Sequence, residues 1–212
     1  MRRQTRLAVR VLIVLALIAS AGAGVYAVWT TAAARQGWNL DIDAALNVVG
    51  VAPGQIVGEA GAGDGYFTLP MARRVGPAGA VLANDISRRA LNSLAASARR
   101  EGLSNIQTVE GAVDDPLFPR RDLDLVVIVH AFHDFDRPVD WLVNTKKYLR
   151  PGGTIAILDR VPGQGAESHF WTRERILGHA ASAGYQMTKL VDSVSQHLII
   201  VLTPQAGGGP PA

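Results

Sequence analysis

Short apolar runs alternate with amphipathic segments along this chain of 212 residues. The run LDLVVIV at residues 123–129 is apolar almost throughout, which is typical of a parallel strand covered on both faces. Segments with helical spacing separate the runs. The pattern predicts strands at 55–60, 80–84, 106–109, 123–129 and 154–158, helices at 41–49, 66–75, 87–101, 139–149 and 172–183, and a terminal hairpin of 185–191 with 197–203.

Alternating strands and helices joined by short turns predict an α/β fold with a doubly wound, mostly parallel sheet. Ligands of such sheets bind beyond the carboxyl ends of the strands. That rule brings the glycine-rich stretch 61–65 together with Asp85, Asp114 and His130, which are far apart in the sequence. The predicted domain covers residues 36–204, and residues 205–212 are expected to be a disordered tail.

Residues 1–35 differ from the rest of the chain in charge and in apolar character. They contain five arginines and no acid, and an uncharged run extends from Val11 to Trp29. A helix of this length just spans a hydrocarbon core, and its basic flank predicts a cytoplasmic amino end. The small residues of its second half also fit a cleaved signal peptide. We therefore expect residues 1–35 to be an anchor or a signal, in a membrane-anchored or exported protein, with the cytoplasmic side left open.

Charge and composition narrow the classes of function. The net charge of +3 comes from those arginines, because without them 16 basic residues face 18 acidic ones. The body of the protein is thus slightly acidic and carries no nucleic-acid footprint. There is no cysteine, which excludes disulfides, thiolate metal ligands and a cysteine nucleophile.

The stretch VGEAGAGDGYF, residues 57–67, holds the main candidate for ligand binding. A dinucleotide loop that starts at Gly61 and Gly63 needs its third glycine where this chain has Tyr66. The carboxylate of Glu59 would repel a pyrophosphate and attract a cation. The sequence therefore favours a positively charged nucleoside without phosphate, such as S-adenosylmethionine. Asp85, at the end of the second strand, can accept hydrogen bonds from both ribose hydroxyls.

Four features occur in order: E-x-G-x-G-x-G after the first strand, an acid after the second, an Asp-containing loop after the third, and L-R-P-G-G before the fifth. This set resembles the class I S-adenosylmethionine-dependent methyltransferases over about residues 40–203. The resemblance implies a Rossmann-like sheet of seven strands with an antiparallel last strand, which agrees with the predicted hairpin. It also implies S-adenosylmethionine as the cofactor.

For the methionine end of the cofactor, the resemblance implies contacts from the first strand and the loop after it. Glu59 would contact this end directly or through water. Gly61, Gly63 and Gly65 would let the backbone approach it and the sugar. His130, at the end of the fourth strand, would lie near the transferable methyl group.

For the nucleoside end, the resemblance implies residues after the second and third strands. Asp85 would hold the ribose, and Ile86 and Val113 would lie against the adenine. Asp114 would face the adenine amine, with Asp115 as the alternative.

The segment HAFHDFD, residues 130–136, supplies the candidate catalytic side chains His130, His133 and Asp134. Either imidazole can accept a proton near neutral pH, if the methyl acceptor arrives protonated. The alternative is that they only line the pocket or cap the next helix. The spacing of His130, His133 and Asp134 could also suggest metal ligation, but no further partner is spaced convincingly. His169 is a distant possibility as that partner, and no metal site is predicted.

Purely structural roles are the alternative for several of these residues. Glu59 could be a solvated acid at a strand end, and Asp85 a helix cap. Phe170 and Trp171 fit both an acceptor pocket and simple packing.

The leading hypothesis is a methyltransferase that acts on an unidentified small-molecule or lipid-like acceptor at a membrane. The alternatives are a cofactor-binding module without transfer activity and a nicotinamide-dependent oxidoreductase, which Glu59 and Tyr66 disfavour. One difficulty accompanies the charge-based orientation: it places the domain outside the cytoplasm, where S-adenosylmethionine is not expected.

Overall fold

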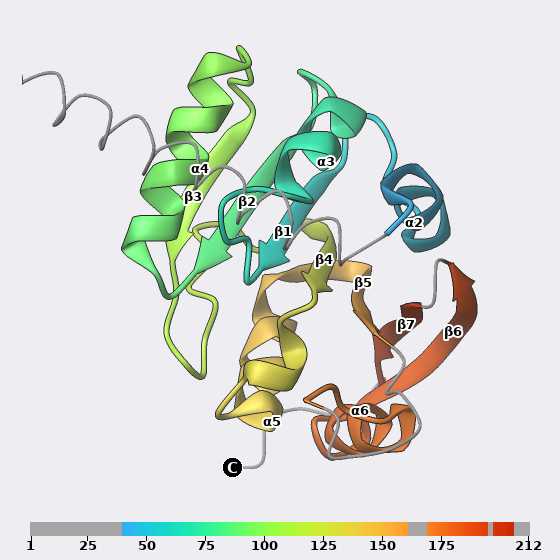
Figure 1. The fold of residues 1–212 in the computed structure, drawn as a ribbon. Coiled ribbons are helices and arrows are strands. Elements are labelled where there is room, and N and C mark those ends of the chain that lie inside the picture. The colour runs from blue at the N-terminus through green and yellow to red at the C-terminus, as the bar shows by residue number, and fades with distance from the viewer. Residues whose placement is uncertain (1–39, 161–168, 195–196, 206–212) are drawn as a thin grey trace, which may run out of the picture. The chain divides into compact units, whose positions relative to one another are not determined.

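The computed structural model describes residues 40–160, 169–194 and 197–205. In this part of the chain seven strands form one sheet in the order β3-β2-β1-β4-β5-β7-β6 (Figure 1). Strands β3, β2, β1, β4 and β5 are paired in parallel, whereas β7 runs antiparallel to both β5 and β6. The strands are β1 (Ile56–Ala60), β2 (Ala80–Asp85), β3 (Ile106–Glu110), β4 (Leu123–Val129), β5 (Leu149–Arg160), β6 (Tyr185–Val194) and β7 (His197–Pro204). The predicted seven-stranded, mostly parallel sheet with its terminal hairpin is confirmed.

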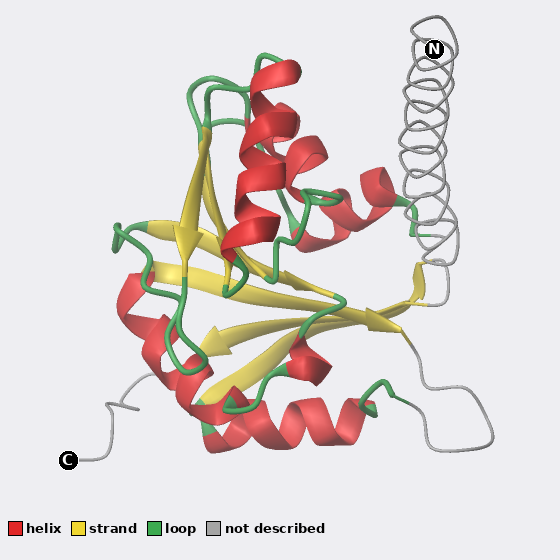
Figure 2. Cartoon of the chain, turned by 60° about the vertical axis from the view of Figure 1, so that its left-hand side comes forward, coloured by secondary structure: helices red, strands yellow, loops and turns green. Residues whose placement is uncertain are grey.

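Helices cover both faces of the sheet (Figure 2). Apolar side chains of α2 and α3 join one buried cluster, and those of α5 and α6 join another on the opposite face. Leu94 of α4 packs on Ala83 of β2, on the same face as α3. The helices are α2 (Ile42–Val49), α3 (Thr68–Val75), α4 (Arg88–Arg100), α5 (Pro138–Thr145) and α6 (Arg173–Ser182), with short 3-10 turns η1 (Phe132–Asp134) and η2 (Lys146–Tyr148).

The sequence of β4 explains its central place. Val126 and Ile128 belong to the cluster beneath α5 and α6, whereas Leu125, Val127 and Val129 belong to the cluster beneath α2 and α3. Successive side chains of a strand point to opposite faces, so a strand covered on both sides must be apolar throughout. The uninterrupted apolar run is therefore the signature of the strand between two helical layers.

Side-chain caps fix two helix starts where the sequence predicted them. Asp41 accepts a hydrogen bond from the backbone N–H of Ala44 at 2.9 Å, at the start of α2. Ser87 accepts one from the N–H of Ala90 at 3.3 Å, at the start of α4. Each cap satisfies a backbone donor that the first helical turn leaves without a partner.

The structure corrects two element boundaries. The predicted helix 139–149 ends as α-helix at Thr145 and tightens into η2. Residues 150–153, which were expected to precede the fifth strand, lie inside β5, which begins at Leu149. The pairing register with β4 shifts there, from Leu123 opposite Leu149 to Leu125 opposite Thr154, so the extra residues form a bulge.

The connection from β3 to β4, residues 111–122, contains neither helix nor strand. Its Phe118 is buried and takes part in the cluster of the α5–α6 face. A Cβ added to Gly58 of β1 would lie 2.7 Å from the Phe118 ring, so the ring rests directly on the strand backbone. The side chains of Phe118 and Leu123 thus pack directly on the backbone of β1.

No helix among the described residues is long and apolar enough to cross a membrane. The hydrophobic helix predicted within residues 1–35 lies outside the described residues, as does the tail from residue 206.

Candidate active site

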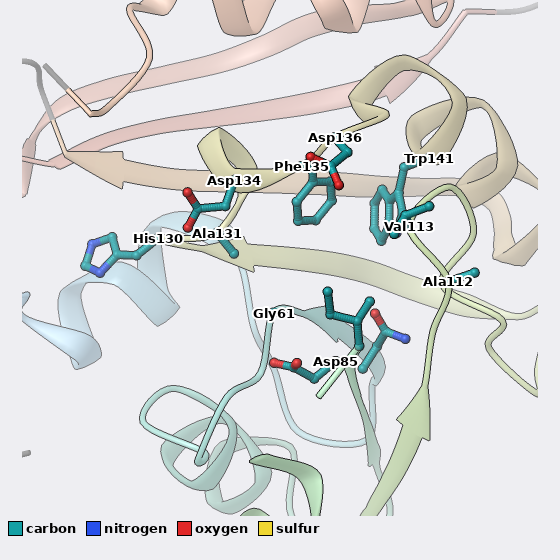
Figure 3. Close-up of a pocket in the computed structure, with 12 residues that line it drawn as sticks. Gly61, Asp85, Ala112, Val113, His130, Ala131, Asp134, Phe135, Asp136 and Trp141 are labelled. Carbon is teal, nitrogen blue, oxygen red and sulfur yellow. The ribbon is translucent and has the colours of Figure 1, made fainter. Parts of the chain in front are cut away.

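A pocket of about 290 Å³ opens at the carboxyl ends of β1, β2 and β4 (Figure 3). Six residues predicted for the site line it: Gly61, Asp85, Ile86, Val113, His130 and Asp134. The remaining lining residues are Asn84, Ala112, Ala131, Phe135, Asp136 and Trp141. The carboxyl-end rule therefore brings together side chains that lie far apart in the sequence.

The glycine loop between β1 and α3 depends on its lack of side chains. Gly61, Gly63 and Gly65 all have positive φ angles, of 71°, 54° and 97°. A Cβ on Gly61 would lie 2.4 Å from the Cβ of Ala131, and one on Gly65 would lie 2.4 Å from Leu94. A Cβ on Gly63 would meet nothing within 4 Å. Gly61 is therefore required for the close approach of β1 to the segment after β4, and Gly63 presents bare backbone.

Asp85 joins the loop to the end of β2. Its Oδ2 accepts a hydrogen bond from the N–H of Gly63 at 2.8 Å, and its Oδ1 accepts one from the N–H of Ser87 at 2.7 Å. Each carboxylate oxygen keeps a further lone pair, so the group can still accept bonds from a ligand. Asp85 acts as a local cap on the backbone and as a pocket acid at the same time.

Two exposed apolar side chains stand beside this acid. Ile86 is 65% exposed and Val113 is 47% exposed, and both line the pocket. Large aliphatic side chains left in water favour an apolar, flat ligand surface such as an aromatic ring. Their positions after β2 and β3 agree with the predicted adenine contacts.

Glu59 lies below the glycine loop and is not among the described residues that line the pocket. The hydroxyl of Thr68 donates to its Oε2 at 2.5 Å. Burial, with a smaller contribution from the charge of Asp85, raises the pKa of Glu59 to about 8 despite the Thr68 hydrogen bond. From its sequence position an anionic carboxylate was expected; burial instead keeps this carboxyl mostly neutral at pH 7.

The two acids after β3 are held by side chains on the α5 side. Asp114 forms an ion pair with Arg137 at 2.6 Å. Asp115 pairs with Lys147 and accepts from the Tyr148 hydroxyl at 2.7 Å. Burial alone would raise the pKa of Asp115, but these hydrogen bonds outweigh it and lower that pKa. Neither acid belongs to the described lining, so a contact of Asp114 with adenine remains a prediction.

His130 lines the pocket at the end of β4 in a left-handed conformation, with a φ of 50°. Its ring stacks on that of His197 with centroids 4.7 Å apart. Burial first, and the neighbouring His197 second, lower the pKa of His130 to about 4. The imidazole is therefore neutral at pH 7 and a weak base.

His133 points away from the pocket, toward the end of β5. Its Nδ1 lies 2.6 Å from the Oδ2 of Asp159, and both side chains are buried. Burial alone would lower the pKa of His133, but the hydrogen bond and charge of Asp159, together with Asp134, raise it. The carboxylate is expected to hold the proton on Nδ1 and to leave Nε2 free to act as an acceptor.

The neighbouring aromatic residues have structural roles. Trp171 is buried and meets Phe132 edge-on at 5.5 Å, and Phe170 meets His133 edge-on at 4.8 Å. Neither ring is among the described residues of the pocket lining, so packing is the better supported of the two interpretations.

Several site residues escaped the sequence analysis. Asn84 is one residue before Asp85, and its amide donates to the carbonyl of Pro116 at 2.8 Å, which ties β2 to the loop after β3. Phe135 and Asp136 continue the segment that was already singled out. Asp159 is the residue before the last of β5, so the same carboxyl-end rule could have found it. His169 was considered only as a distant metal partner, because it lies beyond the last predicted parallel strand.

Comparison with known proteins agrees with this geometry. Residues 57–153 match a family described as "Methyltransferase domain". The chain is 32% identical over 117 residues to nocamycin O-methyltransferase of Saccharothrix syringae, covering 55% of this chain and 42% of that protein. It is 29% identical over 115 residues to a ubiquinone/menaquinone biosynthesis C-methyltransferase of Ectopseudomonas mendocina, covering 54% and 45%.

A solved structure has the same fold. The S-adenosylmethionine-dependent methyltransferase of Aquifex aeolicus aligns with a TM-score of 0.70 at 20% identity, covering 77% of this chain and 89% of that one. The chain spans less than half the length of the two curated sequence relatives that it matches.

Proposed function

We propose, on the premise that residues 57–153 of this chain are a class I S-adenosylmethionine-dependent methyltransferase domain, that the protein transfers a methyl group to a small-molecule or lipid-like acceptor. The charge of the pocket carries this proposal. Asp85, Asp134 and Asp136 line it, and the twelve described lining residues include no lysine or arginine. Such a pocket favours a cationic ligand over a pyrophosphate, and S-adenosylmethionine carries a sulfonium and an ammonium but no phosphate.

The nucleoside end of the cofactor fits the β2 and β3 side of the pocket. Asp85 is positioned by two backbone donors and would accept from the ribose hydroxyls. Ile86 and Val113 would exchange their contact with water for contact with the adenine ring. The bare backbone of Gly63 leaves room for a close approach.

The methionine end fits the β1 side, and there the raised pKa of Glu59 matters. A buried carboxyl can ionise when a cation replaces the solvation it has lost. The ammonium of the cofactor would supply that charge, directly or through water, so uptake of the cofactor near neutral pH would release the Glu59 proton. Glu59 would thus favour a cation at this end and disfavour a phosphate.

The wall after β4 would face the methyl acceptor. The cofactor, when bound, supplies an electrophilic methyl group for in-line displacement, and the protein's part is alignment and exclusion of water. Phe135 and Trp141 give this side of the pocket an apolar surface, and Asp134 and Asp136 give it polar ends. The acceptor is therefore an organic molecule with an apolar body and a polar reacting group.

The membrane part of the proposal rests on the sequence of residues 1–35. An uncharged run from Val11 to Trp29 behind four arginines would hold the domain near a bilayer, where lipid-like acceptors concentrate. The same charges favour the extracytoplasmic side. A reporter that is active in one compartment only, fused after Ala212, tests the orientation. Activity restricted to the cytoplasm would reverse it.

Calorimetry on the full-length chain in mild detergent tests cofactor binding. We expect uptake of S-adenosylmethionine and of its demethylated product, S-adenosylhomocysteine, and a loss of affinity of about a hundredfold in Asp85→Ala, since two charge-assisted hydrogen bonds disappear. Asp122→Ala is the matched control, because Asp122 pairs with Arg120 on the surface. Preferential binding of a nicotinamide dinucleotide would reject the proposal.

Transfer itself is tested with cofactor labelled in the methyl group. We expect label to appear in a lipid or small-molecule fraction of cell extract and not with the Asp85→Ala variant. Tight cofactor binding without a labelled product in any fraction would indicate a binding module instead of an enzyme.

A further inference from the structure

We propose that His133, Asp134 and His169 form a binding site for one divalent transition-metal ion at the acceptor side of the pocket. Their ligand atoms all lie within 4.8 Å of one another. His133 and Asp134 come from the turn after β4, and His169 comes from the segment before α6. The spacing along the chain did not predict this site, because its third member is contributed by a distant segment.

The distances within the cluster fit a shared ion better than direct hydrogen bonds. Nε2 of His133 lies 3.6 Å from one carboxylate oxygen of Asp134, and Nε2 of His169 lies 3.3 Å from the other. Hydrogen bonds between a ring N–H and a carboxylate are usually shorter, about 2.7–3.2 Å. Ligands about 2.1 Å from a tetrahedral ion are separated by about 3.4 Å. The two observed spacings lie close to that edge length, and all three ligand atoms lie within 4.8 Å of one another. Because the two spacings involve different oxygens of Asp134, its carboxylate would turn to bring one oxygen onto the ion.

A buried carboxylate orients the first histidine in the way that metal sites require. Nδ1 of His133 is bonded to Asp159 at 2.6 Å, and the other oxygen of Asp159 accepts from the backbone N–H of Arg160 at 2.9 Å. Asp159 is fully buried. Metal-binding histidines commonly donate their second nitrogen to a carboxylate, which fixes the tautomer and the ring orientation. The arrangement leaves Nε2 of His133 directed at the cluster.

Exposure differs among the ligands in a way that leaves room for an ion. The His133 side chain is only 3% exposed, whereas those of Asp134 and His169 are 61% and 68% exposed. The buried imidazole forms a fixed base, and the other two ligands keep contact with solvent, so an ion can enter. Asp134 also lines the pocket, at the end that His130 occupies (Figure 3).

The ligand set indicates the class of ion. Two imidazoles and one carboxylate are typical of Zn²⁺, Fe²⁺, Co²⁺ and Mn²⁺, whereas Mg²⁺ and Ca²⁺ prefer oxygen ligands. Three protein ligands leave at least one position open, as in catalytic zinc sites. The bound ion would carry two positive charges beside two carboxylates, Asp134 and Asp159.

The position of the site names the acceptor chemistry, and this step rests on the proposed function. An open position next to the pocket would bind an oxygen of the acceptor and lower the pKa of its hydroxyl. The hydroxyl proton would leave to water, and the resulting oxygen anion would attack the methyl carbon while the carbon–sulfur bond breaks. We therefore infer that the acceptor is an alcohol, phenol or enol, and that His133 acts as a ligand instead of a general base.

Zinc titration of the full-length chain, without cofactor or acceptor, tests the site. The chain is stripped with a chelator and titrated with ZnCl₂ against a chromophoric competitor. We expect one equivalent to bind, and we expect His169→Ala and Asp134→Asn to weaken binding by about a hundredfold or more. Asp159→Asn, which changes only the orienting carboxylate, is expected to weaken it by about 10–100-fold. Titration with Co²⁺ is expected to give the intense visible absorption of a tetrahedral or five-coordinate site.

Two controls separate a built site from surface adsorption and from misfolding. Asp122→Asn removes an exposed carboxylate elsewhere and is expected to bind zinc like the parent chain. Cofactor binding by His169→Ala reports whether the domain is folded, because His169 is exposed and is not among the described residues that line the pocket. For Asp134→Asn, which lines the pocket, the unfolding free energy in urea reports the fold instead.

The outcomes decide the proposal in either direction. Zinc binding that is absent, or that persists unchanged in His169→Ala and in Asp134→Asn, would overturn the metal site and leave cofactor binding untouched. Conversely, a chain that binds zinc but no S-adenosylmethionine would retain the site and reject the proposed function. If both hold, label on a nitrogen or carbon atom of the product would reject the inferred acceptor chemistry alone.

Discussion

The two ends of the pocket are built by different means. The cofactor end is made of the contiguous loop 61–65 and Asp85, fixed by backbone contacts such as the hydrogen bond from Gly63. The proposed acceptor end is made of side chains that follow β4, and the metal cluster proposed beside it draws on three places in the chain, since His133 depends on Asp159 and faces His169. A constraint on the backbone can be recognised in the sequence as a motif of neighbouring residues. A cluster of side chains from separate segments becomes visible only in the tertiary structure. Substitutions at the cofactor end are therefore expected to cause large losses of stability and of cofactor affinity. Substitutions at the acceptor end are expected to change the choice of substrate.

The largest effect is expected from Gly61→Ala. A positive φ costs a residue with a side chain about 1–2 kcal/mol, and the collision with Ala131 adds about 1–3 kcal/mol. We expect a clear loss of unfolding free energy in urea and a fall in cofactor affinity of more than a hundredfold. Gly54→Ala, with a φ of 82° and nothing near its Cβ, carries the backbone cost alone. Equal effects of the two substitutions would contradict the contact with Ala131.

Glu59 gives the next largest effect, and it depends on pH. Since its pKa is about 8, uptake of a cation must displace the proton at lower pH. The affinity for S-adenosylmethionine is expected to rise with pH, by up to about tenfold per unit between pH 6 and 7.5. Glu59→Gln should bind more weakly at pH 7.5 and lose this slope, as measured by calorimetry. A slope that survives in the variant would assign the proton to another group.

A smaller effect is expected from the two exposed aliphatic residues of the cofactor end. Ile86→Ala and Val113→Ala should each weaken cofactor binding by about fivefold, which corresponds to about 1 kcal/mol for partly buried methyl groups. The unfolding free energy should change by less than about 0.5 kcal/mol, because both side chains are exposed without ligand. Met187→Ala, another exposed apolar position, is the control. Unaltered affinity in both variants would remove these residues from the adenine site.

The smallest effect on cofactor affinity is expected from the acceptor end. His130→Asn keeps a residue that tolerates the left-handed backbone, and the dissociation constant should change by less than about threefold. Because the pKa of His130 is about 4, the rate of methyl transfer at pH 7 should fall by less than about tenfold. A loss of a hundredfold or more would restore His130 as the general base.

The sequence allowed most of the fold to be predicted, for local reasons. The buried strands were predicted from their apolar runs. The helices predicted to begin at Asp41 and Ser87 do start there, because each side chain accepts a hydrogen bond from a backbone N–H three residues later. The glycine loop was equally readable, since its constraint lies in consecutive residues. The start of β5 was predicted wrongly because its pairing with β4 extends across a bulge. Residues 150–153 therefore belong to the strand.

The candidate site was predictable only in part. Strand ends could be listed from the sequence, so Gly61, Asp85 and His130 were expected together and line one pocket, whereas Asp114 is not among its described lining residues. Electrostatic states could not, because the pKa of Glu59 depends on how completely the fold excludes water from it. The cluster of His133, Asp134 and His169 could not be predicted either, because the sequence pattern does not show which loops lie next to each other in the fold.

The helix-free connection from β3 to β4 links the ligand pocket to the buried core. Val113, at the pocket, and Phe118, seated on Gly58 in the core, stand five positions apart on the same stretch of chain. Because only four residues separate them, a displacement of Val113 is expected to be transmitted in part to Phe118. When a purine binds against Val113, the backbone amides of β1 should therefore exchange their hydrogens more slowly. The exchange rate of a buried strand would then report whether the pocket is occupied.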